Sequence, residues 1–98
     1  MSDKYVLEGK TPKPIEDILE WARWFEIANR HVAKTDLPNN VSVSTVFLGL
    51  DHQFSGGSPI LFETMIFGGK YDNYQERYST WKEAEDGHKQ AVTLANSS

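Results

Sequence analysis

The residues of this chain that could do chemistry are three histidines and a scattered set of carboxylates. Asp51 and His52 follow one another at the end of an apolar run, and Glu63 lies within the next apolar run. Together with His88, these side chains are of the types that bind zinc, provided that all four converge. Neighbouring residues of a strand point to opposite faces, so Asp51 and His52 form no dyad unless the loop bends them together. We expect them to shape the loop by hydrogen bonding, and we expect no metal or other cofactor.

Nucleophilic catalysis is not indicated by the sequence. The chain has no cysteine, which excludes a thiolate nucleophile, a disulfide and a cysteine-based metal site. No serine occupies the centre of a Gly-x-Ser-x-Gly turn. The segment Ser55-Gly56-Gly57-Ser58 is followed by neither the lysine nor the helix of a phosphate-binding loop. We therefore predict that the protein is not an enzyme and has no catalytic residues.

The run from Val41 to Gly69 is expected to form the centre of the fold. It contains two β-prone apolar segments, 41–51 and 60–67, joined by a polar, glycine-rich connection. Apolar residues occur on both faces of each predicted strand, so both faces of this hairpin need cover. One helix on each face would supply it, or both helices on one face and a partner on the other.

Helical patterns flank the hairpin on both sides. Apolar residues recur at helical spacing in the first of them, which predicts a helix over 14–34 that starts near Pro14. The segment Thr80-Trp81-Lys82-Glu83 is a capping-box pattern, which predicts a second helix over 81–95.

Two short β-prone segments, 4–8 and 74–79, are predicted to be edge strands. The expected structure is a single α+β domain over residues 1–98. It has a small antiparallel sheet of three to four strands around the central hairpin 41–67, packed with two helices in the order β-α-β-β-β-α.

The distribution of charge argues against direct binding of nucleic acid. The formal net charge is −4, and no Lys or Arg lies between Lys34 and Lys70. Binding to a phosphate backbone needs clustered cations. The sequence also contains no apolar run of the ~20 residues that span a bilayer, and no run typical of a signal peptide. We expect an intracellular protein that does not bind membranes.

Aromatic residues exceed what one small core needs, with three Trp, four Tyr and five Phe. Those left outside the core, next to acidic residues, would form a protein-binding surface. Glu63 is the only charge in its apolar strand, and Arg77 on the following strand is a possible cross-strand partner for it. The residues from which we expect partner contacts are Asp51, His52, Phe54, Glu63 and Trp24.

Several segments, in this order, resemble a family of small proteins encoded by tailed bacteriophages and prophages. The segments are Trp21–Phe25, Ser44–His52, Leu61–Met65, Phe67-Gly68-Gly69, Arg77–Trp81, Glu83-Ala84 and Gly87-His88. The resemblance covers most of the chain, and the family carries no catalytic residues that could be transferred to it. What the resemblance implies is origin: a phage accessory protein that acts in the cytoplasm of the bacterial host.

We therefore predict a non-enzymatic phage accessory protein that binds a host or phage protein, for example as an inhibitor of a host defence factor. Two alternatives stay open. One is a structural module that forms a homodimer through the two-sided hairpin. The other is a small metal- or ligand-binding enzyme that uses the hairpin tip.

Overall fold

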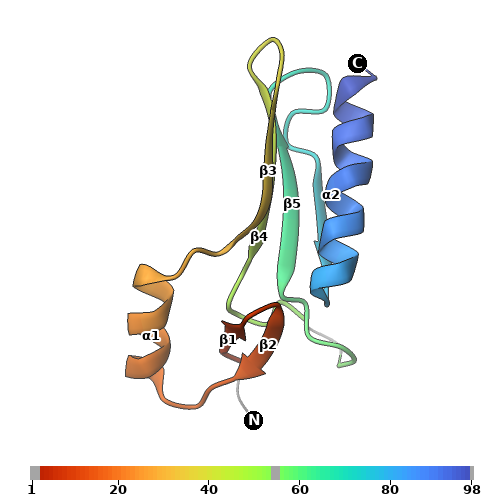
Figure 1. The fold of residues 1–98 in the computed structure, drawn as a ribbon. Helices are drawn as coiled ribbons and strands as arrows, with labels where there is room; N and C mark the ends of the chain where they lie inside the picture. Colours follow the sequence, from red (N-terminus) through yellow and green to blue (C-terminus); the bar gives the residue numbers. More distant parts are fainter. Residues whose placement is uncertain (1–2, 54–55, 98) are drawn as a thin grey trace.

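The computed structural model describes residues 3–53 and 56–97 as an α+β fold with two antiparallel sheets and two helices (Figure 1). The elements in chain order are β1 (Tyr5–Glu8), β2 (Thr11–Pro14), α1 (Ile18–Ile27), β3 (His31–Leu37), β4 (Val41–Phe47), β5 (Phe62–Phe67), β6 (Gln75–Tyr78) and α2 (Trp81–Asn96). The predicted α+β class is confirmed, with two strands more than the predicted order contains.

The larger sheet has the strand order β3-β4-β5-β6, so the predicted hairpin lies at its centre. The register of β4 and β5 runs from Ser42 opposite Phe67 to Phe47 opposite Phe62. Strand β4 is shorter than the predicted 41–51. Gly49 has a φ of +79°, a left-handed conformation that turns the chain out of the sheet.

The predicted helix over 14–34 was too long at both ends. Pro14 ends β2, and the helix starts after Asp17, whose carboxylate accepts the N–H groups of Leu19 and Glu20 at 2.9 and 3.2 Å. The helix ends at Ile27. The side chain of Asn29 then accepts the N–H of His31 at 3.1 Å, which turns the chain into the next strand.

Strand β3 includes the last four residues of the predicted helix, 31–34, and pairs with β4 from Leu37 opposite Val41 to Ala33 opposite Thr45. The turn between them contains Asn39 and Asn40, with φ of 65° and 62°. Asparagine tolerates this left-handed conformation better than most residues, so the two asparagines suit a hairpin turn.

Helix α2 covers one face of the larger sheet (Figure 1). The packing forms two apolar clusters. The first is centred on Val41, Val43, Ile66, Ala91 and Ala95, and the second on Phe47, Leu61, Phe62 and Ala84. Polar side chains that are also buried lie on the same face at intermediate positions of β4, β5 and α2, namely Thr45, Thr64 and His88.

His88 joins α2 to the sheet through hydrogen bonds. Its Nδ1 lies 2.7 Å from the hydroxyl of Thr45, and its Nε2 lies 2.9 Å from the hydroxyl of Thr35. The Thr45 hydroxyl is also hydrogen-bonded to that of Thr64. Burial lowers the pKa of His88, because the charged ring would lose its hydration. Both ring nitrogens of the neutral His88 side chain are thus hydrogen-bonded to threonine hydroxyls.

The second face of the sheet is covered by neither helix. Helix α1 lies beyond the end of the sheet, next to β1, so the expectation of a helix on each face, or of two on one face, was wrong (Figure 1). Val46 and Met65 on this face are partly exposed, and the side chain of Phe67 is 45% exposed. A partner on this face stays a prediction.

Strands β1 and β2 form a separate two-stranded sheet, in register from Tyr5 opposite Pro14 to Glu8 opposite Thr11. Tyr5 ties it to the end of β4, since its N–H donates to the carbonyl of Gly49 at 2.8 Å. The segment 4–8 is therefore a strand as predicted, but it belongs to the second sheet. Neither helix of the described residues is long and apolar enough to cross a membrane.

Candidate protein-binding surface

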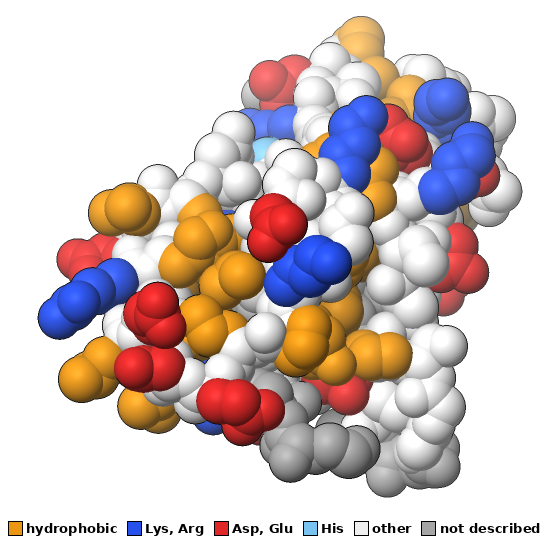
Figure 2. Space-filling model, turned by 60° about the horizontal axis from the view of Figure 1, so that its bottom comes forward, with side chains coloured by type: hydrophobic (Ala, Val, Ile, Leu, Met, Phe, Trp, Pro, Cys, Tyr) orange, Lys and Arg blue, Asp and Glu red, His pale blue; other side chains and the backbone are white. Residues whose placement is uncertain are grey.

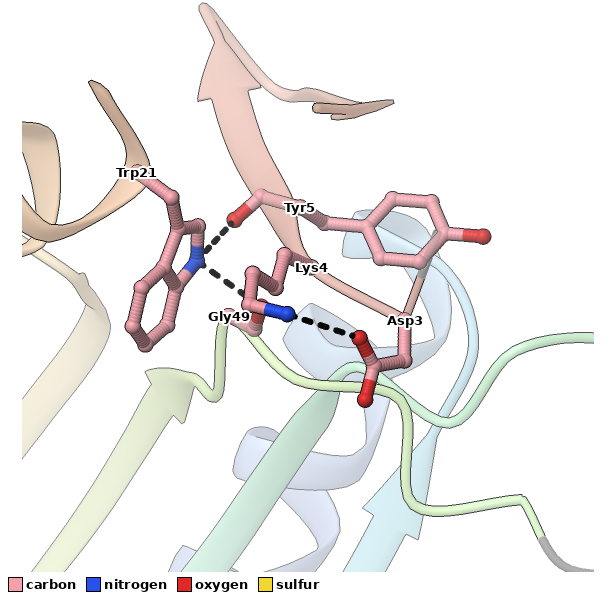
Figure 3. Close-up of polar contacts among 5 residues, drawn as sticks. All are labelled: Asp3, Lys4, Tyr5, Trp21 and Gly49. Atoms are coloured by element: carbon pink, nitrogen blue, oxygen red, sulfur yellow. Dashed lines mark hydrogen bonds and ion pairs between the residues drawn. The ribbon is translucent and has the colours of Figure 1, made fainter. Parts of the chain in front are cut away.

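Helix α1 is held to the body of the protein by aromatic side chains. The indole N–H of Trp21 points between the carbonyl oxygens of Tyr5 and Gly49, each 3.2 Å away (Figure 3). The rings of Trp21 and Phe25 pack together with their centroids 4.9 Å apart. One side of α1 is thus fixed to β1 and to the end of β4.

The ring of Phe25 also packs against Gly49, two residues after the end of β4. A Cβ atom at Gly49 would lie 2.9 Å from a ring carbon of Phe25, closer than side chains pack. The guanidinium of Arg30 lies over the Phe25 ring, 4.0 Å from its centroid, and donates to the carbonyl of Phe47 at 3.1 Å. Trp24 packs edge-on against Phe47, with centroids 5.8 Å apart.

Exposed apolar side chains occur on more than one side of α1. The exposed fractions are 59% for Ile18, 66% for Leu19 and 85% for Ile27, and no residue of the helix is fully buried. Seven of its ten residues are apolar. Leu19 and Ile27 lie on the side of α1 that faces away from Trp21 and Phe25, with Arg23 between them. Exposed apolar side chains that are grouped together and rimmed by polar residues are typical of protein-binding surfaces.

Acidic side chains surround this exposed side. Within residues 16–27 there are four carboxylates and one guanidinium, all exposed. They are Glu16, Asp17, Glu20, Glu26 and Arg23. Figure 2 shows hydrophobic and acidic side chains side by side on the protruding part of the molecule. We call these five residues, with Ile18, Leu19 and Ile27, the α1 surface.

Asp51 and His52 lie in the connection between β4 and β5, where they organise the backbone. The carboxylate of Asp51 accepts the N–H groups of Gln53 and Ile60, at 2.8 and 2.9 Å. The N–H of His52 donates to the carbonyl of Ile60 at 3.0 Å. These bonds close the connection across its base, Asp51 through its side chain and His52 through its backbone N–H, so a role of the His52 side chain stays a prediction.

Glu63 faces the uncovered side of the sheet and is paired within the protein. Its carboxylate lies 3.0 Å from Nε of Arg77, directly opposite on β6, and it also accepts from the side-chain amide of Gln75. The other predicted contact residues lie elsewhere. Trp24 packs against Phe47 in the second apolar cluster, and Phe54 lies outside the described residues.

The four residues considered for a metal site do not form one. Asp51 binds backbone N–H groups, Glu63 is paired with Arg77, and His88 is buried between threonines. Over the described ranges 3–53 and 56–97, no group of three or more His, Asp or Glu side chains is placed to hold a metal ion.

Sequence reasoning did not single out Ile18, Leu19 and Ile27 as contact residues. The signal was present in the composition of α1, because apolar residues occupy more positions than one buried stripe requires. The pattern predicted a wide apolar face, but it did not indicate which part of that face the fold leaves open.

Comparisons with known proteins find no match: no protein-family model, no curated protein and no solved structure is similar to this chain.

Proposed function

We propose that this protein is a non-enzymatic accessory protein of a bacteriophage or prophage, and that it binds a host or phage protein through the α1 surface. The observation that carries the proposal is the exposure of Leu19 and Ile27 on a helix that is otherwise fixed in place by its aromatic side chains. A helix that is already held in place loses little backbone conformational entropy when it binds a partner, which favours a specific complex. The phage origin is drawn from the resemblance of the segments described above.

The partner that fits the α1 surface is a protein with a basic rim around an apolar groove. Carboxylates around the exposed apolar side chains attract cations, and Leu19, Arg23 and Ile27 follow one another at i, i+4 and i+8 along the helix. Basic surfaces of this kind occur in proteins that bind nucleic acid. If α1 occupied such a site on a host defence factor, it would block nucleic-acid binding and so inhibit that factor.

The test begins with affinity isolation from lysates of bacteria, followed by reconstitution of the complex from the purified partner and the purified protein. Isothermal titration calorimetry then compares the natural chain with the Leu19→Ser/Ile27→Ser variant. We expect the variant to bind at least about tenfold more weakly, since hot-spot side chains contribute 2 kcal/mol or more. Binding should also weaken as salt rises.

The matched control is Phe67→Ser, which removes an exposed apolar side chain from the uncovered face of the sheet. It should bind as the natural chain does. Equal binding by the α1 variant and the natural chain would contradict the proposal, as would the absence of any partner that binds after purification.

A further inference from the structure

The two edges of the larger sheet differ in how they are protected. Strand β6 has four residues, and three of them are Gln75, Glu76 and Arg77, so this edge is short and polar. Strand β3 has seven residues and carries no proline. In the part of the chain that the structure describes, no strand pairs with its outer edge. An edge of this length that no strand covers can accept a further strand, provided that the charges it carries, Lys34 and Asp36, find partners there.

We propose that a second copy of this chain occupies the β3 edge, antiparallel to it and related by a two-fold axis midway between the two copies of Thr35. The pairing joins two four-stranded sheets into one continuous sheet. The homodimer is distinct from the α1 surface, because α1 lies at the end of the sheet where β3 begins and supplies none of the paired residues 33–37 (Figure 1).

The register follows from the symmetry of an antiparallel pair. Directly opposite residues of paired strands lie on the same face, so a two-fold axis between the strands must place one residue opposite its own copy. With the axis at Thr35, Lys34 lies opposite Asp36 of the second copy, and Asp36 lies opposite its Lys34. An axis at Lys34 or at Asp36 would instead place two like charges against each other.

The charges on β3 are therefore self-complementary in one register. Both side chains are available, with exposed fractions of 55% for Lys34 and 78% for Asp36. Their ion pair within one chain, at 3.6 Å, keeps them side by side on the strand. Pairing of two copies gives each lysine a second carboxylate, and opposite charges across strands stabilise a sheet.

The opposite face of the same edge carries Ala33, Thr35 and Leu37, and the Thr35 hydroxyl is hydrogen-bonded to His88. Leu37 lies on the α2 side, packed against the cluster around Val41, and it would lie opposite Ala33 of the second copy. A hollow next to it is lined by Leu37, Pro38, Asn39, Val41, Ala95 and Asn96. The paired segment, 33–37, also begins after the irregularity of β3 between His31 and Ala33, so it uses the regular part of the strand.

Charge reversal tests this register directly. Sedimentation equilibrium of the natural chain should show a dimer. Lys34→Asp and Asp36→Lys should each weaken dimerisation about tenfold, because two like-charge pairs form across the axis. The double variant Lys34→Asp/Asp36→Lys restores both opposite pairs and should return the dimer constant to within about threefold of the natural one.

Two controls accompany these variants. Lys89→Asp makes the same change in net charge as Lys34→Asp, at an exposed position of α2, and should leave the dimer unchanged. Far-UV circular dichroism of each variant verifies the fold.

A natural chain that is monomeric at the highest concentration reached would overturn the proposal, as would a dimer that tolerates single reversals or is not rescued by the double variant. Leu19→Ser/Ile27→Ser should dimerise normally, so this result is distinguishable from that of the α1 test.

Discussion

Gly87 of α2 lies so close to Tyr78 of β6 that a Cβ atom at position 87 would overlap the hydroxyl and ring of the tyrosine. The glycine is buried in the middle of a helix, where alanine is otherwise preferred by about 1 kcal/mol. Burial raises the pKa of Tyr78, because the ionised side chain would lose its hydration. The absence of a side chain at Gly87 therefore lets α2 approach the edge strand closely.

Gly87→Ala should lower the free energy of unfolding by about 1–3 kcal/mol, because overpacking outweighs the gain in helix propensity. Chemical denaturation followed by circular dichroism measures the change. The control is the same substitution in a Tyr78→Ala background, where the overlap is absent and Gly87→Ala should be neutral or stabilising. An equal loss in both backgrounds would show that contact with Tyr78 does not explain the glycine.

His88 should make stability depend on pH. Burial lowers its pKa below the ordinary value of 6.5, so the unfolded chain binds this proton more readily than the folded protein. Stability contributed by the neutral ring is present above pH 6.5 and is lost as the pH falls from there toward the lowered pKa. Denaturation curves collected between pH 7.5 and about pH 5 measure this loss.

The variant His88→Gln separates titration from packing. It keeps an amide that can bond to Thr45, but it has no proton to gain, so stability should change less over the same pH range. His31→Gln, at an exposed position of β3, should retain the pH dependence of the natural chain. Loss of the dependence in the His31 variant instead would contradict the assignment to His88.

Two elements could be predicted from the sequence because local chemistry determines them. The capping box that predicted α2 is formed, with the Thr80 hydroxyl accepting the Glu83 N–H and the Glu83 carboxylate accepting the Thr80 N–H, each at 3.1 Å. The hairpin of β4 and β5 follows from its two apolar, β-prone runs.

Strand β3 could not be predicted in the same way, because its sequence continues the helical spacing of α1. Val32 follows Ala28 at the spacing of a helix, and only pairing with β4 makes the extended conformation favourable. The same holds for the α1 surface. The exposure of Ile27 depends on where the whole helix docks, which is set by Trp21 and Phe25 contacts with distant residues.

Arg77 should stabilise the sheet through Glu63, whose side chain is only 13% exposed. Arg77→Met keeps the aliphatic part of the side chain but leaves this carboxylate with Gln75 alone. We expect a loss of about 1 kcal/mol, moderate because the guanidinium is partly exposed. In a Glu63→Gln background, Arg77→Met should cost less. Lys82→Met, which breaks the exposed pair of Lys82 and Asp86, is the control and should have no measurable effect.

Gly49 should determine whether α1 docks. Alanine at this position is strained by its φ of +79° and also meets the ring of Phe25, 2.9 Å from the new Cβ. We expect Gly49→Ala to lower stability by more than the roughly 1 kcal/mol that a left-handed alanine costs. Hydrogen exchange should show loss of protection in α1, while α2 keeps its protection.

Gly9→Ala is the matched control for Gly49→Ala, because Gly9 has a φ of +65° and open space around its Cβ position. It carries the conformational strain without the contact, so the difference between the two variants measures the Phe25 contact itself. Equal losses in the two variants would mean that the aromatic contact does not hold α1. Selective loss of protection in Gly49→Ala, together with weaker partner binding, would show that docking of α1 preorganises the α1 surface.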